Sequence, residues 1–146
     1  MSLIAGIIAY MTSQTGITDE MFQSSADHIT PQKRKEGYGL PAITIQTVSH
    51  RHEQHMTAAA GIANATIQID CWAASAIAAR TVADEVRAEL DGYTAAAGKM
   101  GAVDVRRVSL INESDNYNTA GDGSDAGTYR IIQDYSIWHL ENVPSF

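Results

Sequence analysis

Three histidines stand close together between residues 49 and 56, and their spacing suits metal binding. His50 and His52 are two positions apart, so both would project from the same face of a β-strand. If His55 folded back toward them, the three imidazoles could hold a zinc ion. The same residues also fit a solvated hairpin loop, and no second group of ligands in the sequence completes a metal site. We therefore predict a polar connection over residues 49–56, with no bound metal and no cofactor.

Two other groups of residues carry potentially reactive side chains. Asp122 and Asp125 stand among glycines as in some calcium loops, but the regular ligand spacing and the closing Glu of such a loop are missing. Cys71 is a potential nucleophile, but it alternates with Ile67 and Ile69 on an apolar face, where a thiol is usually inert. The sequence also has no Gly-x-Ser-x-Gly elbow and no glycine-rich phosphate loop. We therefore predict no catalytic residue and a protein that is not an enzyme.

Length and charge narrow the remaining classes of protein. The 146 residues suit a single domain over residues 1–146. A net charge of −7 and a pI of about 5.0 argue against specific nucleic-acid binding, which needs a clustered basic surface. The apolar stretch at residues 1–10 is too short to cross a bilayer, so we expect no membrane association. The one cysteine excludes an intramolecular disulfide and fits a reducing cytoplasm.

Apolar periodicity predicts two helices and four main strands. Ser2 can cap a first helix that runs to about residue 14, and Gly16 can end it. Ser75 can cap a second helix that ends at Gly92 and buries a stripe of Ala, Val and Leu. The strands are predicted over residues 42–48, 62–72, 103–111 and 128–141, with a short further strand near residues 28–30 and a surface loop over residues 32–39.

These elements follow the order helix, hairpin, helix, hairpin. Each strand has one apolar and one polar face, so the sheet needs cover on one side only. We predict an α+β fold in which two helices pack on one face of a mainly antiparallel four-stranded sheet. Residues 113–127 contain four acidic residues, three glycines and no basic residue. We predict that they form a mobile acidic loop, because such a segment buries too little surface to offset its ordering entropy.

Two tryptophans fall on the polar face of this predicted sheet. If the strand register were one residue off, Trp72 and Trp138 would both lie in the core. Otherwise the open face carries an aromatic surface for association, because Trp is enriched at the centres of interfaces. We take association as the hypothesis and include the acidic loop in it. The candidate interface residues are Trp72, Trp138, Gln68, Asp70, Asp134, Asp122 and Asp125.

Several segments of the chain carry a recognisable pattern of strands and packing residues. They are residues 40–46, residues 67–73, the alanine-rich helix that ends with Leu90, Asp91 and Gly92, and residues 129–138. Together they resemble the phage tail-completion or tail-terminator proteins, also called head–tail joining proteins, of siphophages, prophages and gene transfer agents. The resemblance extends from residue 1 to about residue 140.

The resemblance implies a structural protein of the virion with no catalytic residues. It implies a ring, typically a hexamer, that caps the finished tail tube and offers a surface to the head connector. The expected partners are further copies of this chain, the tail-tube protein and the head-connector protein. The expected location is the head–tail junction of a virion made in the bacterial cytoplasm. Two alternatives stay open here, namely another minor tail or neck protein, and a small-molecule-binding domain or enzyme.

Overall fold

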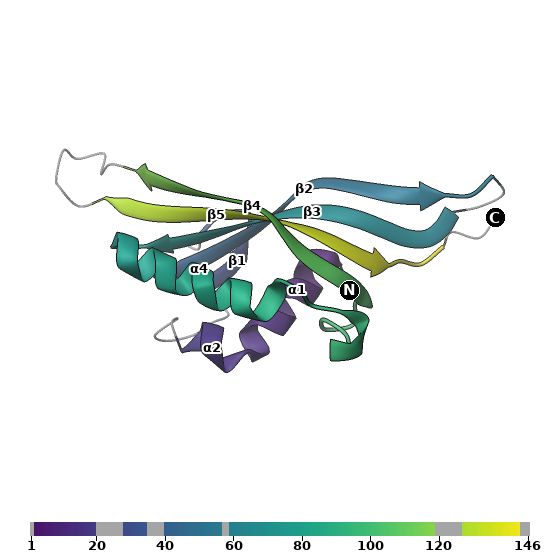
Figure 1. Ribbon diagram of the computed structural model, residues 1–146, viewed down its shortest axis with the longest axis horizontal. Coiled ribbons are helices and arrows are strands. Elements are labelled where there is room, and N and C mark those ends of the chain that lie inside the picture. The colour runs from purple at the N-terminus through teal and green to yellow at the C-terminus, as the bar shows by residue number, and fades with distance from the viewer. Residues whose placement is uncertain (1, 20–27, 35–39, 57–58, 119–126, 144–146) are drawn as a thin grey trace.

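A five-stranded sheet with helices on one of its faces forms the protein (Figure 1). The computed structural model describes residues 2–19, 28–34, 40–56, 59–118 and 127–143. The strand order is β1-β2-β3-β5-β4, in which β1 is parallel to β2 and every other pair is antiparallel. The strands are β1 (Ile29–Pro31), β2 (Ala42–Gln54), β3 (Ala59–Ala73), β4 (Val105–Asn118) and β5 (Thr128–Leu140).

The first helix begins where the sequence predicts it. Helix α1 covers Leu3–Ser13, and the Ser2 hydroxyl accepts a hydrogen bond from the Ala5 amide at 3.2 Å. The cap satisfies one of the amides that a helix start leaves without a partner. A second, short helix, α2 (Thr15–Thr18), follows after one extended residue. The prediction that Gly16 ends the first helix is therefore wrong, since Gly16 lies inside α2.

Helix α4 is the longest helix among the described residues. It covers Ala76–Leu90, and the Ser75 hydroxyl caps it by accepting a hydrogen bond from the Ala78 amide at 3.1 Å. Gly92 follows with a φ of +87°, a conformation that glycine adopts without steric cost. These bounds agree with the predicted helix. A short 3₁₀ turn, η1 (Ala95–Ala97), leads on toward β4.

The core lies between the helices and one face of the sheet. Helix α4 packs on β3, β4 and β5, while α1 packs on β1 and β2. Each fully buried aliphatic side chain stabilises the fold by about 1.5–3 kcal/mol. The largest fully buried side chains are Tyr135, Ile7, Met11, Ile17, Ile29, Ile43, Ile45, Ile67, Ile69, Leu90 and Met100.

The helices cover only part of this long sheet. In Figure 1 the end of β2, the start of β3 and the end of β5 continue beyond α1 and α4, whereas the end of β4 and the start of β5 lie over the start of α4. None of the described helices is long and apolar enough to span a membrane. The fold therefore offers one face without helical cover in the described chain, and one sheet end that extends past the helices.

Three expectations about the fold need correction. The fold is α+β as predicted, but the sheet has five strands, because β1 adds a parallel strand beside β2. The polar connection predicted over residues 49–56 is mostly strand, since β2 runs to Gln54. Residues 113–118 of the predicted acidic loop belong to a strand, since β4 continues to Asn118. Residues 119–126 lie outside the described residues, so their predicted mobility stays a prediction.

Candidate assembly surface

The two tryptophans lie on the face of the sheet that the helices leave open. The predicted alternation of β3 is correct, since Ala65, Ile67, Ile69 and Cys71 are fully buried on the helix side. Trp72 and Trp138 are half-buried on the opposite face. The alternative reading, in which a shifted register puts both in the core, is therefore wrong.

The strand register separates these two tryptophans along the sheet. Trp72 pairs with Arg130, while Trp138 pairs with Asn64. About eight residues of strand therefore lie between the two side chains, which is roughly 26 Å. The tryptophans do not form one continuous patch. They mark the two ends of a strip on β3 and β5, which we call the open strip. Its residues are Asn64, Thr66, Gln68, Asp70 and Trp72 on β3, and Arg130, Ile132, Asp134, Ser136 and Trp138 on β5.

Trp72 is held in place by contacts on several sides. Its indole N–H donates a hydrogen bond to the Thr44 hydroxyl at 3.0 Å. The guanidinium groups of Arg34 and Arg130 lie 5.0 and 4.9 Å from the centroid of its ring, within the range of cation–π attraction. Trp72 is thus a preorganised aromatic platform. The two arginines could not be assigned to Trp72 from the sequence, because each comes from a distant part of the chain.

The middle of the open strip is polar and partly desolvated. Asp70 is only 6% exposed, and it accepts a hydrogen bond from the Gln68 side-chain amide at 2.9 Å. Burial raises the pKa of Asp70, the Gln68 hydrogen bond and the Arg130 charge oppose that rise, and the charge of Asp134 adds to it. Arg130 lies 3.7 Å from the Asp70 carboxylate, and its Nε is buried without a hydrogen bond to a described residue. The centre of the strip is therefore a set of charged and hydrogen-bonding groups rather than an apolar patch.

The other candidate residues are placed as follows. Gln68 and Asp134 are direct cross-strand neighbours in the middle of the strip, as the sequence alternation implied. Asp122 and Asp125 lie outside the described residues, so their place at the interface stays a prediction. Cys71 is fully buried under the helices, and burial raises the pKa of its thiol, which keeps it protonated and unreactive.

One group of potential metal ligands occurs among the described residues. It consists of His50, His52 and Glu141, and His55 does not belong to it. The histidines were candidate ligands from the sequence, whereas Glu141, near the other end of the chain, was missed. The available signal was a second pair at strand spacing, since His139 and Glu141 are also two positions apart.

The sequence matches the family described as "Tail completion protein gp17" over residues 19–140, most of the chain. The chain belongs to this family. No curated protein matches the sequence. Among solved structures, a chain from the "Virion of native gene transfer agent (GTA) particle" has the same fold, with a TM-score of 0.70, 12% identity and coverage of 95% of each chain.

Membership of the family settles the class of the protein. The family is one of structural virion proteins and not of enzymes, so the prediction that the chain is not an enzyme is confirmed. The resemblance to phage tail-completion proteins is confirmed as well. The chain is a structural protein of a phage-like tail, and it works in contact with other components of the virion.

Proposed function

We propose that the protein forms a closed ring of identical subunits, a hexamer, that caps the tail tube and joins the tail to the head connector. Its partners are then neighbouring copies of the chain, the tail-tube protein and the head-connector protein. The observation that carries the proposal is the open strip, in which two tryptophans flank a polar centre on a sheet face without helical cover in the described chain. Family membership gives the setting, a phage tail.

The arrangement of the open strip suits contacts between subunits. Binding energy in interfaces concentrates in a few Trp, Tyr and Arg residues surrounded by contacts that exclude water. Trp72 stacks with arginines at one end of the strip, and Trp138 lies at the other end. A closed ring uses heterologous contacts, so the strip of one subunit meets a different surface of the next. Two anchors roughly 26 Å apart fix the angle between subunits better than a single central patch would.

The ring also has to end tube growth and let DNA pass. In a ring whose two sides differ, one side can bind the end of the tail tube. The other side then lacks the surface to which a further ring of the tube would bind, so growth stops. We place Asp122 and Asp125 at the bore, where a negative lining repels DNA phosphates and prevents adhesion. The overall charge of −7 is compatible with this role.

The test compares Trp138→Ser with wild-type protein. We choose Trp138 because Trp72 also contacts Thr44 within its own subunit. Loss of an anchor that contributes about 2 kcal/mol weakens association by roughly thirtyfold. We expect rings of wild-type protein in negative-stain micrographs and light scattering, and mainly monomers of Trp138→Ser at the same concentration. Ile77→Ser is the matched control, because Ile77 is 82% exposed on α4 and is not a residue of the open strip, so this variant should still form rings.

Two results would contradict the proposal. Rings of Trp138→Ser at wild-type strength would show that the open strip is not the contact surface. A wild-type protein that stays monomeric at every concentration, with Trp138 shielded from a soluble quencher, would show that Trp138 only packs within its own subunit. Circular dichroism of each variant establishes that the fold is intact.

A further inference from the structure

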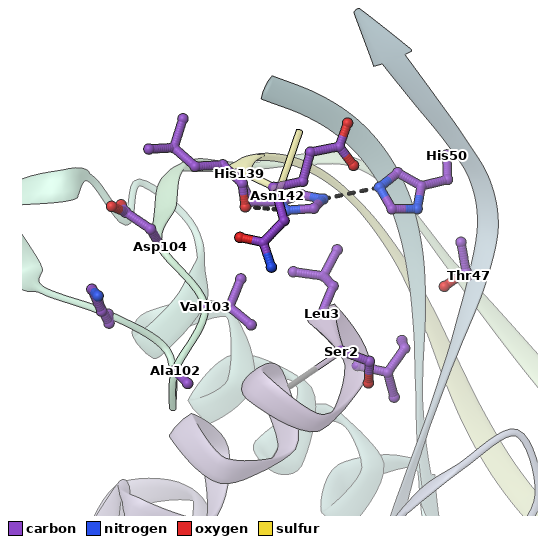
Figure 2. Close-up of a pocket in the computed structure, with 13 residues that line it drawn as sticks. Ser2, Leu3, Thr47, His50, Ala102, Val103, Asp104, His139 and Asn142 are labelled. Carbon is purple, nitrogen blue, oxygen red and sulfur yellow. Dashed lines mark hydrogen bonds between the residues drawn. The ribbon is translucent and has the colours of Figure 1, made fainter. Parts of the chain in front are cut away.

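Imidazole and carboxylate groups from two strands meet at the end of the sheet that extends past α1. His50 and His52 come from β2, His139 comes from β5, and Glu141 follows β5 directly. The Nδ1 atom of His52 lies 2.6 and 2.8 Å from the two carboxylate oxygens of Glu141. The Nε2 atoms of His50 and His139 are 2.9 Å apart, as the dashed line in Figure 2 shows. Residues 89 positions apart in the sequence therefore form one cluster.

The strand register explains why these side chains meet. Strand β3 lies between β2 and β5, and Ala63 pairs with His52 on one side and with His139 on the other. Ala65, the neighbour of His50, is also an alanine, and both alanines are fully buried. Because these central residues are small, the longer side chains of the flanking strands reach toward each other across β3. The centroids of the His50 and His139 rings are 5.1 Å apart.

The distances within the cluster fit the coordination of a metal ion. One ring nitrogen from each of His50 and His52 and one oxygen of Glu141 lie within 4.8 Å of one another. Zinc binds nitrogen and oxygen at about 2.0–2.2 Å in a tetrahedral arrangement, so two ligand atoms on one ion are roughly 3.3–3.6 Å apart. The most distant ligand atoms thus have to approach by up to roughly 1.5 Å, and the side chains of His50 and His52 are exposed enough to move. We propose that His50, His52 and Glu141 bind a divalent transition-metal ion of the zinc class.

A further imidazole, that of His139, lies beside the three proposed ligands. The Nδ1 atom of His139 lies 3.2 Å from the Leu140 carbonyl oxygen, which can only accept a hydrogen bond. Its other ring nitrogen, Nε2, faces the Nε2 atom of His50 at 2.9 Å. His139 thus places a further ring nitrogen beside the three proposed ligands.

The proposed ion lies at the wall of a cavity. This cavity has a volume of about 670 Å³, and His50, His139 and Glu141 form part of its lining, together with Leu3 and Val103 (Figure 2). There is room for water or another ligand on the ion, as in metal sites with two His, one Glu and an open position. A bound ion would also link the end of β2 to the end of β5 across β3. The expectation of a metal-free protein rested on the lack of a further ligand near His50 and His52, which Glu141 now supplies.

The test is metal binding by protein without a polyhistidine tag, after removal of metals with a chelator. Titration with Zn²⁺ by calorimetry should show one ion per chain, and Co²⁺ should give the visible absorption of a site with nitrogen ligands. Loss of an outer partner of a metal ligand already weakens binding by about 10–100-fold, so His52→Ala and Glu141→Gln should each weaken it at least tenfold. His55→Ala is the matched control, because His55 is close in sequence but outside the cluster. The Zn²⁺ affinity of this variant should stay within about twofold of wild type.

Two outcomes would overturn the proposal. If the wild type shows no saturable Zn²⁺ binding, His52 and Glu141 form only a hydrogen-bonded pair within the protein. An equal loss of affinity in His55→Ala would mean that the ion binds the hairpin rather than the cluster. The Co²⁺ spectrum of the wild type decides the question even if a variant does not fold, because an ion with only water ligands has a much weaker spectrum. Ring formation is measured separately, so failure here leaves the proposed function intact.

Discussion

Glu113 connects strand β4 to helix α4 through its charge. Its carboxylate lies 2.8 Å from Arg80 on α4 and accepts a hydrogen bond at 2.7 Å from the side chain of Gln133 on β5. Gln133 is fully buried, donates to the Ala83 carbonyl and accepts from the Tyr135 hydroxyl. A chain of polar groups thus runs from the surface into the core, where each buried group has a partner.

We predict that Glu113→Gln lowers the free energy of unfolding by about 0.5–1 kcal/mol at pH 7, the size expected for a partly exposed ion pair. The hydrogen bond from Arg80, helped by Gln133, holds the pKa of Glu113 below its ordinary value. A lowered pKa in the folded state gives stability that is present above the unfolded value of about 4.3 and is lost as the pH falls through the folded value. Urea unfolding of both proteins at several pH values should show the difference shrink below about pH 4.

Asp115→Asn is the control for that experiment, because Asp115 is exposed on the same strand, two residues further on. Its stability difference from wild type should stay small at all pH values. A difference between wild type and Glu113→Gln that is unchanged at pH 3.5 would contradict the assigned role of the Glu113 charge.

Side chains that meet within one strand or helix were predictable from the sequence, and those that meet across strands were not. The pair of Arg80 with Asp84 on α4 follows from helical spacing and is present, at 3.1 Å. The contacts of Arg130 with Trp72 and of Glu141 with His52 depend on the order β2-β3-β5. Periodicity indicates on which face of a strand a residue lies, but it does not indicate which other strand lies next to it in the sheet.

The strands were predicted best where helices cover them. Residues 42–48 and 62–72 lie within β2 and β3 as predicted. One missed part, residues 49–54 of β2, lies at the sheet end that projects beyond the helices, whereas the other, residues 113–118 of β4, lies on an edge strand beside the start of α4 (Figure 1). Both segments are almost entirely exposed, so neither has a buried side and the alternation of apolar and polar residues disappears. These segments then look like loops in the sequence, although hydrogen bonds with β3 and β5 hold them.

Helix α1 packs closely against the turn that precedes β4. At Gly6 a Cβ atom would lie 2.7 Å from the Met100 carbonyl oxygen and 2.7 Å from Cγ2 of Val103. The backbones of Met100 and Val103 are joined by two hydrogen bonds, which restrict the movement of this turn. The glycine therefore allows a helix-to-turn contact that no other residue permits at this distance.

We predict that Gly6→Ala destabilises the protein by about 1–3 kcal/mol, the usual cost of overpacking. Helix propensity alone predicts the opposite, since Ala in a helix is more stable than Gly by about 1 kcal/mol. The sign of the change therefore decides between the two effects, and thermal unfolding measures it. Ala88→Gly at an exposed position of α4 calibrates the propensity effect and should destabilise by up to about 1 kcal/mol. A stabilised Gly6→Ala variant would show that the turn moves away from α1.

The proposed association of whole subunits has to overcome their like charge. Each chain carries a net charge of −7, and the centre of the open strip holds Asp70 and Asp134. Apolar burial of the tryptophans is not weakened by salt, whereas repulsion between exposed charges is screened over about 10 Å at 0.1 M salt and about 3 Å at 1 M. In the proposed ring, the effect of apolar burial can thus be distinguished from that of charge repulsion by varying the ionic strength.

If the proposed ring forms through the open strip, we predict that it becomes more stable with salt. Raising NaCl from 0.1 to 1 M should tighten association severalfold in sedimentation velocity, because repulsion between the acidic subunits falls while the contacts of Trp72 and Trp138 persist. Trp138→Ser should stay dissociated at both concentrations, which distinguishes ring formation from general salting out. Dissociation of wild-type rings at 1 M NaCl would point to a different interface, in which the acidic surface of one subunit attracts basic residues of the next, such as the exposed Arg106 and Arg107 on β4.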